Sequence, residues 1–205
     1  MTWGKYAFSR DFVDSKIPDE LKKEIIIKSY DCGKEEVSLL FERVGKFSPI
    51  EYINKFELKL IEKKTSENID THFLFAQFNP PNEIAIYPEN IAAINELLIH
   101  SKEYGLSQYV DPTNAVLAHE LFHYLESSSK MLYTTAVKVP LWRFLRFTYT
   151  STLIAPGEIA AMSFAREMLS LPYNPFIYDI LLAYAKDKER GVELIQKLND
   201  LEKCL

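Results

Sequence analysis

The sequence contains little cysteine and no excess of positive charge. Its two cysteines, Cys32 and Cys204, lie near opposite ends of the chain, and neither has the spacing from another cysteine or a histidine that a zinc ribbon requires. We therefore expect two reduced thiols and no dependence on a disulfide. The formal net charge is −5, with 24 Lys and Arg against 29 Asp and Glu. Because nucleic-acid-binding proteins need a basic surface for the phosphate backbone, nucleic acid is not an expected partner.

We also expect no secretory signal and no membrane-spanning segment. The first 14 residues mix charged with aromatic residues and contain no apolar core of the kind that a secretory signal needs. The longest apolar stretch, Val139 to Ala155, is interrupted by Arg143 and Arg146, which is not typical of a transmembrane helix. The sequence therefore predicts a cytoplasmic protein for which a membrane is not the expected partner.

The sequence does contain enough apolar residues for one core. Hydrophobic residues make up 47% of the 205 residues, and a chain of this size can bury about 70% of its unfolded surface. No repeat, low-complexity tract or Pro/Gly/Ser-rich linker divides it, so we expect one domain over residues 1–205. Within this domain we expect a helical N-terminal part, a core part and C-terminal helices, at residues 1–50, 55–172 and 173–205.

Hydrophobic periodicity predicts the order of the secondary-structure elements. Apolar residues at helical spacing run from Ile17 to Val44, with Asp31-Cys32-Gly33 as a break between two helices. Beyond Phe56 apolar and polar residues alternate, which predicts three short strands, at 56–60, 73–78 and 83–87. Asn79-Pro80-Pro81-Asn82 separates the last two strands as a hairpin loop.

Helical patterns return after Pro88 and continue almost to the end of the chain. They cover residues 89–104, 112–126, 157–169 and 175–204, the last as one helix or as a pair broken near Arg190-Gly191. Helices, then a small sheet, then helices predict an α+β fold with a mostly antiparallel three-stranded sheet.

One of the predicted helices carries three ionisable residues in an otherwise apolar sequence. The segment Ala115 to Leu125 is apolar on nearly every side except at His119, Glu120 and His123, so we expect a buried helix. Residues four apart lie one turn above the other on one face, so both imidazoles can reach one ion. Glu120 lies about 100° around the helix, where it can approach a metal-bound water without coordinating the metal.

This spacing is the His-Glu-x-x-His arrangement of zinc hydrolases. In such sites Zn²⁺ takes neutral imidazoles and a carboxylate, and a water in the open position has its pKa lowered toward about 7. The alternative is that His119 and His123 are hydrogen-bonded core histidines, but burying two imidazoles and a carboxylate costs free energy unless something binds them. We therefore predict one zinc ion per chain, although two imidazoles and a carboxylate also accept Mn²⁺ or Fe²⁺.

A catalytic zinc site needs a third protein ligand, and Glu158 is the best candidate. It begins the next strong helical pattern, and the small residues Ala161 and Ala165 follow on the same face, where they would let this helix approach the histidine helix closely. The alternative is an ordinary acidic residue stabilised by the dipole at a helix N-terminus. That alternative explains the charge but not the alanines.

The residues of both helices together are similar to those of a known family. Ala118-His119-Glu120-Leu121-Phe122-His123, followed at a distance by Glu158-x-x-Ala161-x-x-Phe164-Ala165-x-x-Met168-Leu169-x-x-Pro172, resembles the ImmA/IrrE-type metallopeptidases, among the zincins whose third ligand is glutamate. The resemblance covers about Glu83 to Pro172. It implies a zincin-like fold, with the small sheet packed on the buried HExxH helix. It also implies zinc ligands at His119, His123 and Glu158, with Glu120 as general base and acid. The strand at 83–87 would border the cleft and bind an extended peptide substrate by strand addition.

Two further features have open interpretations. The segment 139–149, between the two ligand-bearing helices, is aromatic and contains two arginines; it can be a lid or groove wall, a core helix with exposed arginines, or a membrane-surface element. Peptide hydrolysis also needs a donor that stabilises the oxyanion. None is singled out among the candidates Tyr133, Tyr149, His72 and His100.

Together these observations predict a zinc-dependent metallopeptidase, an endopeptidase that acts on peptide or protein substrates with Glu120 moving the proton. The rival prediction is a non-catalytic protein that keeps the zincin scaffold and holds a protein partner in its cleft. The complete set of four residues favours the enzyme, because a scaffold that only binds has no need for Glu120.

Overall fold

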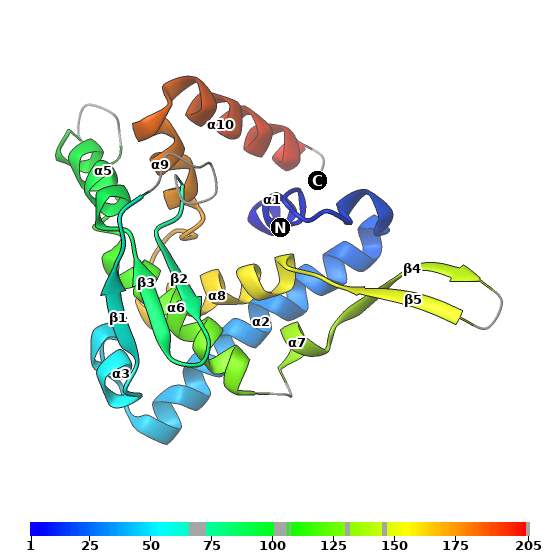
Figure 1. The fold of residues 1–205 in the computed structure, drawn as a ribbon. Helices are drawn as coiled ribbons and strands as arrows, with labels where there is room; N and C mark the ends of the chain where they lie inside the picture. Colours follow the sequence, from blue (N-terminus) through cyan, green and yellow to red (C-terminus); the bar gives the residue numbers. More distant parts are fainter. Residues whose placement is uncertain (66–72, 101–105, 107, 130–131, 145–146, 204–205) are drawn as a thin grey trace.

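The computed structural model describes residues 1–65, 73–100, 106, 108–129, 132–144 and 147–203. These residues form a mixed α+β fold, mostly helical, with a small three-stranded sheet. Figure 1 shows the sheet on one side of the molecule and the helix α8 (Ala155–Met168) lying along the long helix α2 (Asp19–Val44).

The N-terminal part contains one long helix where the sequence predicts two. After α1 (Thr2–Phe8) and the short 3₁₀ helix η1 (Asp14–Lys16), α2 continues without a break through Gly33. A Cβ atom at position 33 would lie 2.3 Å from the carbonyl oxygen of Ala160 in α8. The predicted break is therefore wrong, because this glycine lets two helix backbones approach closely and tertiary packing outweighs its low helix propensity.

The small sheet follows α3 (Pro49–Lys55) and consists of β1 (Lys59–Glu62), β2 (Ala76–Asn79) and β3 (Glu83–Ile86), in the order β1-β3-β2. The predicted hairpin between β2 and β3 is confirmed and is antiparallel, whereas β1 pairs with β3 in parallel. The expectation of a mostly antiparallel sheet is thus wrong for one of the two pairings. Burial accounts for the order of the strands, because Ile84 and Ala85 are fully buried and suit a central strand, while β1 is largely exposed and suits an edge.

Six helices follow the sheet in the described part of the chain. They are α5 (Pro88–Ile99), α6 (Thr113–Ser128), α7 (Tyr133–Ala136), α8, α9 (Ile177–Lys186) and α10 (Lys188–Lys203). The C-terminal pattern is a broken pair, but the break lies at Asp187, whose Oδ1 accepts a hydrogen bond from the backbone N–H of Arg190. Gly191 lies inside α10, where a Cβ atom would be 2.4 Å from the Cα of Tyr184. The end of the predicted helix 89–104 lies outside the described residues.

The segment between α7 and α8 is a strand pair. Here β4 (Lys138–Phe144) pairs antiparallel with β5 (Phe147–Thr152), and Figure 1 shows this hairpin extending away from the helices. The alternative of a core helix is therefore wrong for this segment. Aromatic and β-branched residues make up most of it, and these residue types favour strands.

Two groups of buried side chains meet at α8. One group lies between α8, α6 and the sheet and includes Phe122, Leu121, Ile84 and Phe164. The other lies between α8, α1 and α2 and includes Phe8, Ile25, Ile26 and Ile159. Because α8 contributes to both groups, its position is fixed from two sides.

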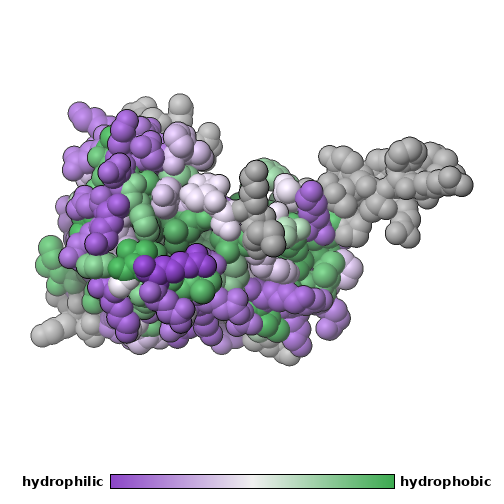
Figure 2. Space-filling view, turned by 90° about the horizontal axis from the view of Figure 1, so that it is seen from below, coloured by the Kyte–Doolittle hydropathy of each residue, from purple (hydrophilic) through white to green (hydrophobic). Residues whose placement is uncertain are grey.

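The solvent-exposed face that includes α2 is mainly polar. The exposed positions of α2 are mostly charged, and Figure 2 shows hydrophilic residues around the face seen from below, with hydrophobic residues between them. In the described part of the chain, no helix combines the length and the apolar character needed to cross a membrane.

Candidate metal centre

Helices α6 and α8 bring together the three residues predicted as metal ligands. The start of α6 is held by Asp111, whose Oδ1 accepts a hydrogen bond from the backbone N–H of Thr113 at 2.7 Å. The small residues Ala161 and Ala165 of α8 are fully buried, as expected for a helix that packs closely on its neighbour. Phe122 of α6 contacts Phe164 of α8, with 5.6 Å between ring centroids.

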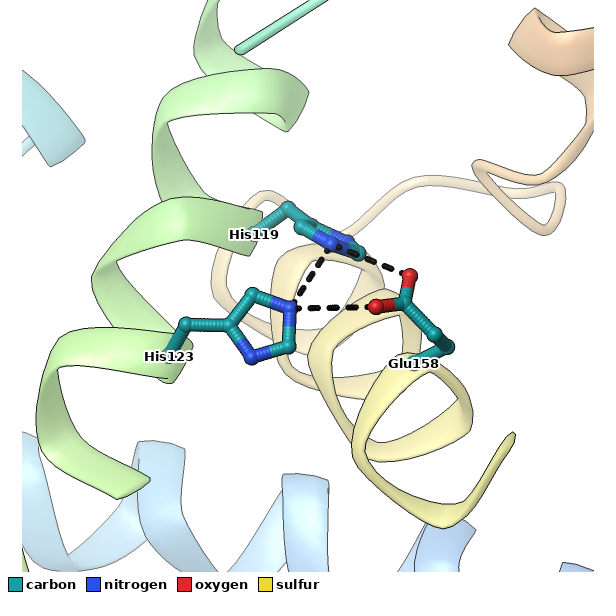
Figure 3. Close-up of side chains that lie close together, drawn as sticks. All are labelled: His119, His123 and Glu158. Atoms are coloured by element: carbon teal, nitrogen blue, oxygen red, sulfur yellow. Dashed lines mark hydrogen bonds and ion pairs between the residues drawn. The ribbon is translucent and has the colours of Figure 1, made fainter. Parts of the chain in front are cut away.

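The ligand atoms of the three residues converge on one point (Figure 3). The Nε2 atoms of His119 and His123 are 3.0 Å apart, and the carboxylate oxygens of Glu158 lie 3.4 Å from the first and 3.5 Å from the second. Donor atoms about 2.0–2.1 Å from a tetrahedral ion lie about 3.3 Å from one another. The three residues therefore fit a divalent metal ion.

The charges of the three side chains depend strongly on one another. Burial lowers the pKa of His123, but the carboxylates of Glu126 and Glu158 outweigh burial and raise this pKa to about 10. Burial raises the pKa of Glu158, but hydrogen bonds from the two histidines outweigh it and hold the pKa well below the usual range. Without a metal ion, His123 is therefore an imidazolium that balances the Glu158 carboxylate, and a bound cation would take over this role from the proton.

Glu120 lies beside the ligands and not among them. Its side chain is 6% exposed, and a carboxylate oxygen accepts a hydrogen bond from the backbone N–H of Phe78 in β2 at 2.6 Å. Burial is the main reason that its pKa is raised. A carboxylate with a raised pKa, held in place but free of the ligand set, can accept and return a proton near neutral pH.

A cavity of about 90 Å³ adjoins the ligands and opens between β2, α6, α8 and α9. His119, Glu120 and Glu158 all line it. Its other walls are mainly apolar, from residues including Phe73, Phe75, Ala76, Val116 and Met162.

The strand at this cavity is β2 and not the strand at 83–87. Because β3 lies in the middle of the sheet, with β1 and β2 on its two sides, the expectation that it borders the cleft is wrong. Ala76 of β2 lines the cavity, and the N–H of Phe78 points to α6. The edge of the sheet near the ligands is therefore that of β2.

The structure also shows residues that sequence reasoning missed. Arg10 and Asp179 line the cavity and form an ion pair of 2.7 Å; no sequence signal connects residues 169 positions apart. Glu126 contacts the second ring nitrogen of His123, and its position three residues beyond that histidine is a signal that could have found it.

None of the four predicted oxyanion donors lines the cavity where the structure describes them. Tyr133 lies near Cys32, against a different hollow, and His100 is exposed at the end of α5. His72 and the side chain of Tyr149 lie outside the described residues.

None of the protein-family models, curated proteins or solved structures compared with this chain matches it.

Proposed function

We propose that this protein is a zinc-dependent metallopeptidase with a zincin-like catalytic core. The main support for the proposal is that four buried or half-buried side chains form a set of three metal ligands with one further carboxylate beside it. His119, His123 and Glu158 direct three donor atoms to one point, within 3.0–3.5 Å of one another. Glu120 faces the same cavity outside that set. A site that only binds a metal for stability has no use for this fourth side chain, a second carboxylate outside the ligand set.

Zinc is the proposed ion because two imidazoles and one carboxylate are a common donor set of catalytic zinc. When bound, such an ion lowers the pKa of a water molecule and polarises a carbonyl group. Glu120 takes a proton from the attacking water and then gives it to the nitrogen of the leaving amine. The N–H of Phe78 holds the carboxylate in place for both transfers.

The cavity supplies the surface for an extended peptide. The carbonyl of Phe75 accepts a hydrogen bond from the backbone N–H of Tyr87, just beyond β3, so this edge of the β2 segment is paired. The N–H of Phe78 points the other way, to Glu120 of α6. The second edge of β2 therefore faces the cavity. An extended peptide that runs along this edge can pair with the backbone of Ala76. Arg10, in the cavity wall, offers N–H donors for a substrate carbonyl oxygen, where negative charge develops during hydrolysis.

The test is cleavage of a mixed peptide library by the zinc-loaded protein, with products identified by mass spectrometry. We expect cleavage by the wild type and a loss of about 10²–10⁴-fold in Glu120→Gln, with zinc content unchanged. Glu167→Gln is the matched control, because Glu167 is an exposed carboxylate of α8 away from the cavity. Equal activity of Glu120→Gln and wild type would refute the proposal. Zinc binding and capture of a peptide without cleavage would favour the non-catalytic scaffold instead.

A further inference from the structure

Glu126 contacts a predicted metal ligand from outside the ligand set. Its Oε2 lies 3.1 Å from Nδ1 of His123, and both side chains are 19% exposed. Figure 3 shows that this second ring nitrogen of His123 faces away from His119 and Glu158. The imidazole is thus contacted on both sides, by Glu158 at Nε2 and by Glu126 at Nδ1.

The carboxylate of Glu126 is held between two helices. It lies on α6, three residues beyond His123, and reaches the first turn of α8 at Gly157. A Cβ atom at position 157 would be 3.2 Å and 3.4 Å from the two carboxylate oxygens. Glycine therefore leaves space that the carboxylate uses, at the positive end of the α8 dipole.

The contact decides which nitrogen of His123 can bind a metal. A neutral imidazole has one N–H group, and a carboxylate accepts hydrogen bonds but donates none when ionised. With Glu126 at Nδ1, the N–H group is at Nδ1, and the lone pair of Nε2 points to the other two ligands. Within the described part of the chain, Nδ1 of His119 is buried without such a partner.

We propose that Glu126 is a positioning residue that fixes the Nδ1–H tautomer and the ring orientation of His123, and that position 157 is glycine to make room for its carboxylate. This inference rests on the proposed metal centre. Carboxylates in this role raise the affinity of a site for its metal by about 10–100-fold. His123 is then the more strongly oriented histidine of the pair, because Nδ1 of His119 has no such partner among the described residues.

The first test compares the zinc affinity of full-length variants by competition with a chelating dye. We expect Glu126→Ala to bind zinc about 10–100-fold more weakly than the wild type. Glu126→Gln, which keeps an oxygen acceptor for the Nδ1–H group, should recover most of the loss. Glu167→Ala, which removes an equal charge from the exposed side of α8, should bind like the wild type.

A spectroscopic readout separates positioning from a general loss of structure. In ¹⁵N NMR spectra of the zinc-loaded protein, His123 should show a protonated Nδ1 and a metal-bound Nε2. The Glu126→Ala spectrum should show this pattern weakened or mixed, with far-ultraviolet circular dichroism unchanged.

A double-mutant cycle tests the part played by Gly157. We expect Gly157→Ala to weaken zinc binding in the wild-type background, because the new methyl group displaces the carboxylate, and to have no effect in the Glu126→Ala background. If the wild type binds zinc and Glu126→Ala binds it equally well with the same NMR pattern, the inference is overturned and the metal centre stands. If the wild type does not bind zinc, both the proposed function and the inference fail.

Discussion

Asp11 stabilises the start of the helix that carries Glu158, although it lies more than 140 residues away in the sequence. Its Oδ2 accepts hydrogen bonds from the backbone N–H groups of Ile154 at 2.9 Å and Ala155 at 3.3 Å. These are the residue before α8 and its first residue. Asp11 therefore caps the N-terminus of α8 from a distant part of the sequence, whereas a capping side chain usually belongs to the residue next to the helix.

We predict that Asp11→Ala destabilises the protein by about 1–2 kcal/mol, the usual cost of removing a cap together with part of a charged hydrogen bond. Ile154 is 61% exposed, so water replaces part of the loss at its N–H, whereas Ala155 is 2% exposed. For a domain of this size, each kcal/mol lowers Tm by about 2–4 °C, so Tm should fall by about 2–8 °C.

The assay is thermal unfolding followed by circular dichroism, with zinc affinity measured on the same samples. Asp11→Asn keeps an oxygen acceptor and should lie between the wild type and Asp11→Ala. Asp14→Ala is the matched control, since it removes a nearby carboxylate that pairs at 2.7 Å with Lys22. This partly buried ion pair is worth about 1 kcal/mol. The reasoning is refuted if Asp11→Ala and Asp14→Ala have the same Tm and the same zinc affinity.

Four further predictions concern the proton of His123, the bound metal and the contact between α2 and α8. The pKa of His123 is raised to about 10 in the metal-free protein, so zinc must displace a proton when it binds. The zinc affinity measured by calorimetry should therefore rise about tenfold per pH unit between about pH 7 and 9. An affinity that does not change with pH would contradict this. By the same raised pKa, the metal-free protein should lose stability as the pH rises through about 10, as judged by its Tm, and this loss should be smaller with zinc bound. Removal of zinc by a chelator should lower the free energy of unfolding by about 2.7 kcal/mol, relative to protein kept at a free zinc concentration of 100 times the dissociation constant. An unchanged midpoint of urea unfolding would refute this prediction. Gly33→Ala should destabilise the protein by about 1–3 kcal/mol or more in urea unfolding, because the methyl group meets the backbone of Ala160. Gly45→Ala is the comparison: this glycine lies at a helix end with a φ of 96°, so the variant tests backbone strain without a contact between helices.

The residues whose arrangement is local could be predicted from the sequence. His119, Glu120 and His123 lie within two turns of one helix, so the helical repeat alone decides their relative positions. Glu158 required one step more, since its helix had to be packed on the histidine helix, and the buried alanines at 161 and 165 carried that information.

Features that depend on packing between distant segments could not be read in this way. Glycine is a poor helix former, so the sequence alone predicts a break at Gly33, yet the approach of α8 decides its role. The central place of β3 depends on where β1 pairs, and a strand pattern carries no information about its neighbour. The Arg10–Asp179 pair joins the N-terminal segment to α9, and neither residue stands in a motif.

The proposed metal centre requires that three side chains from two helices hold one metal ion. Elemental analysis of the purified protein, after removal of loosely bound ions and incubation with zinc, measures this without a substrate. We predict about one zinc ion per chain in the wild type and much less in Glu158→Ala, with Glu167→Ala equal to the wild type. A wild-type protein that takes up no zinc, or a Glu158→Ala variant that retains it fully, would contradict the proposed metal centre.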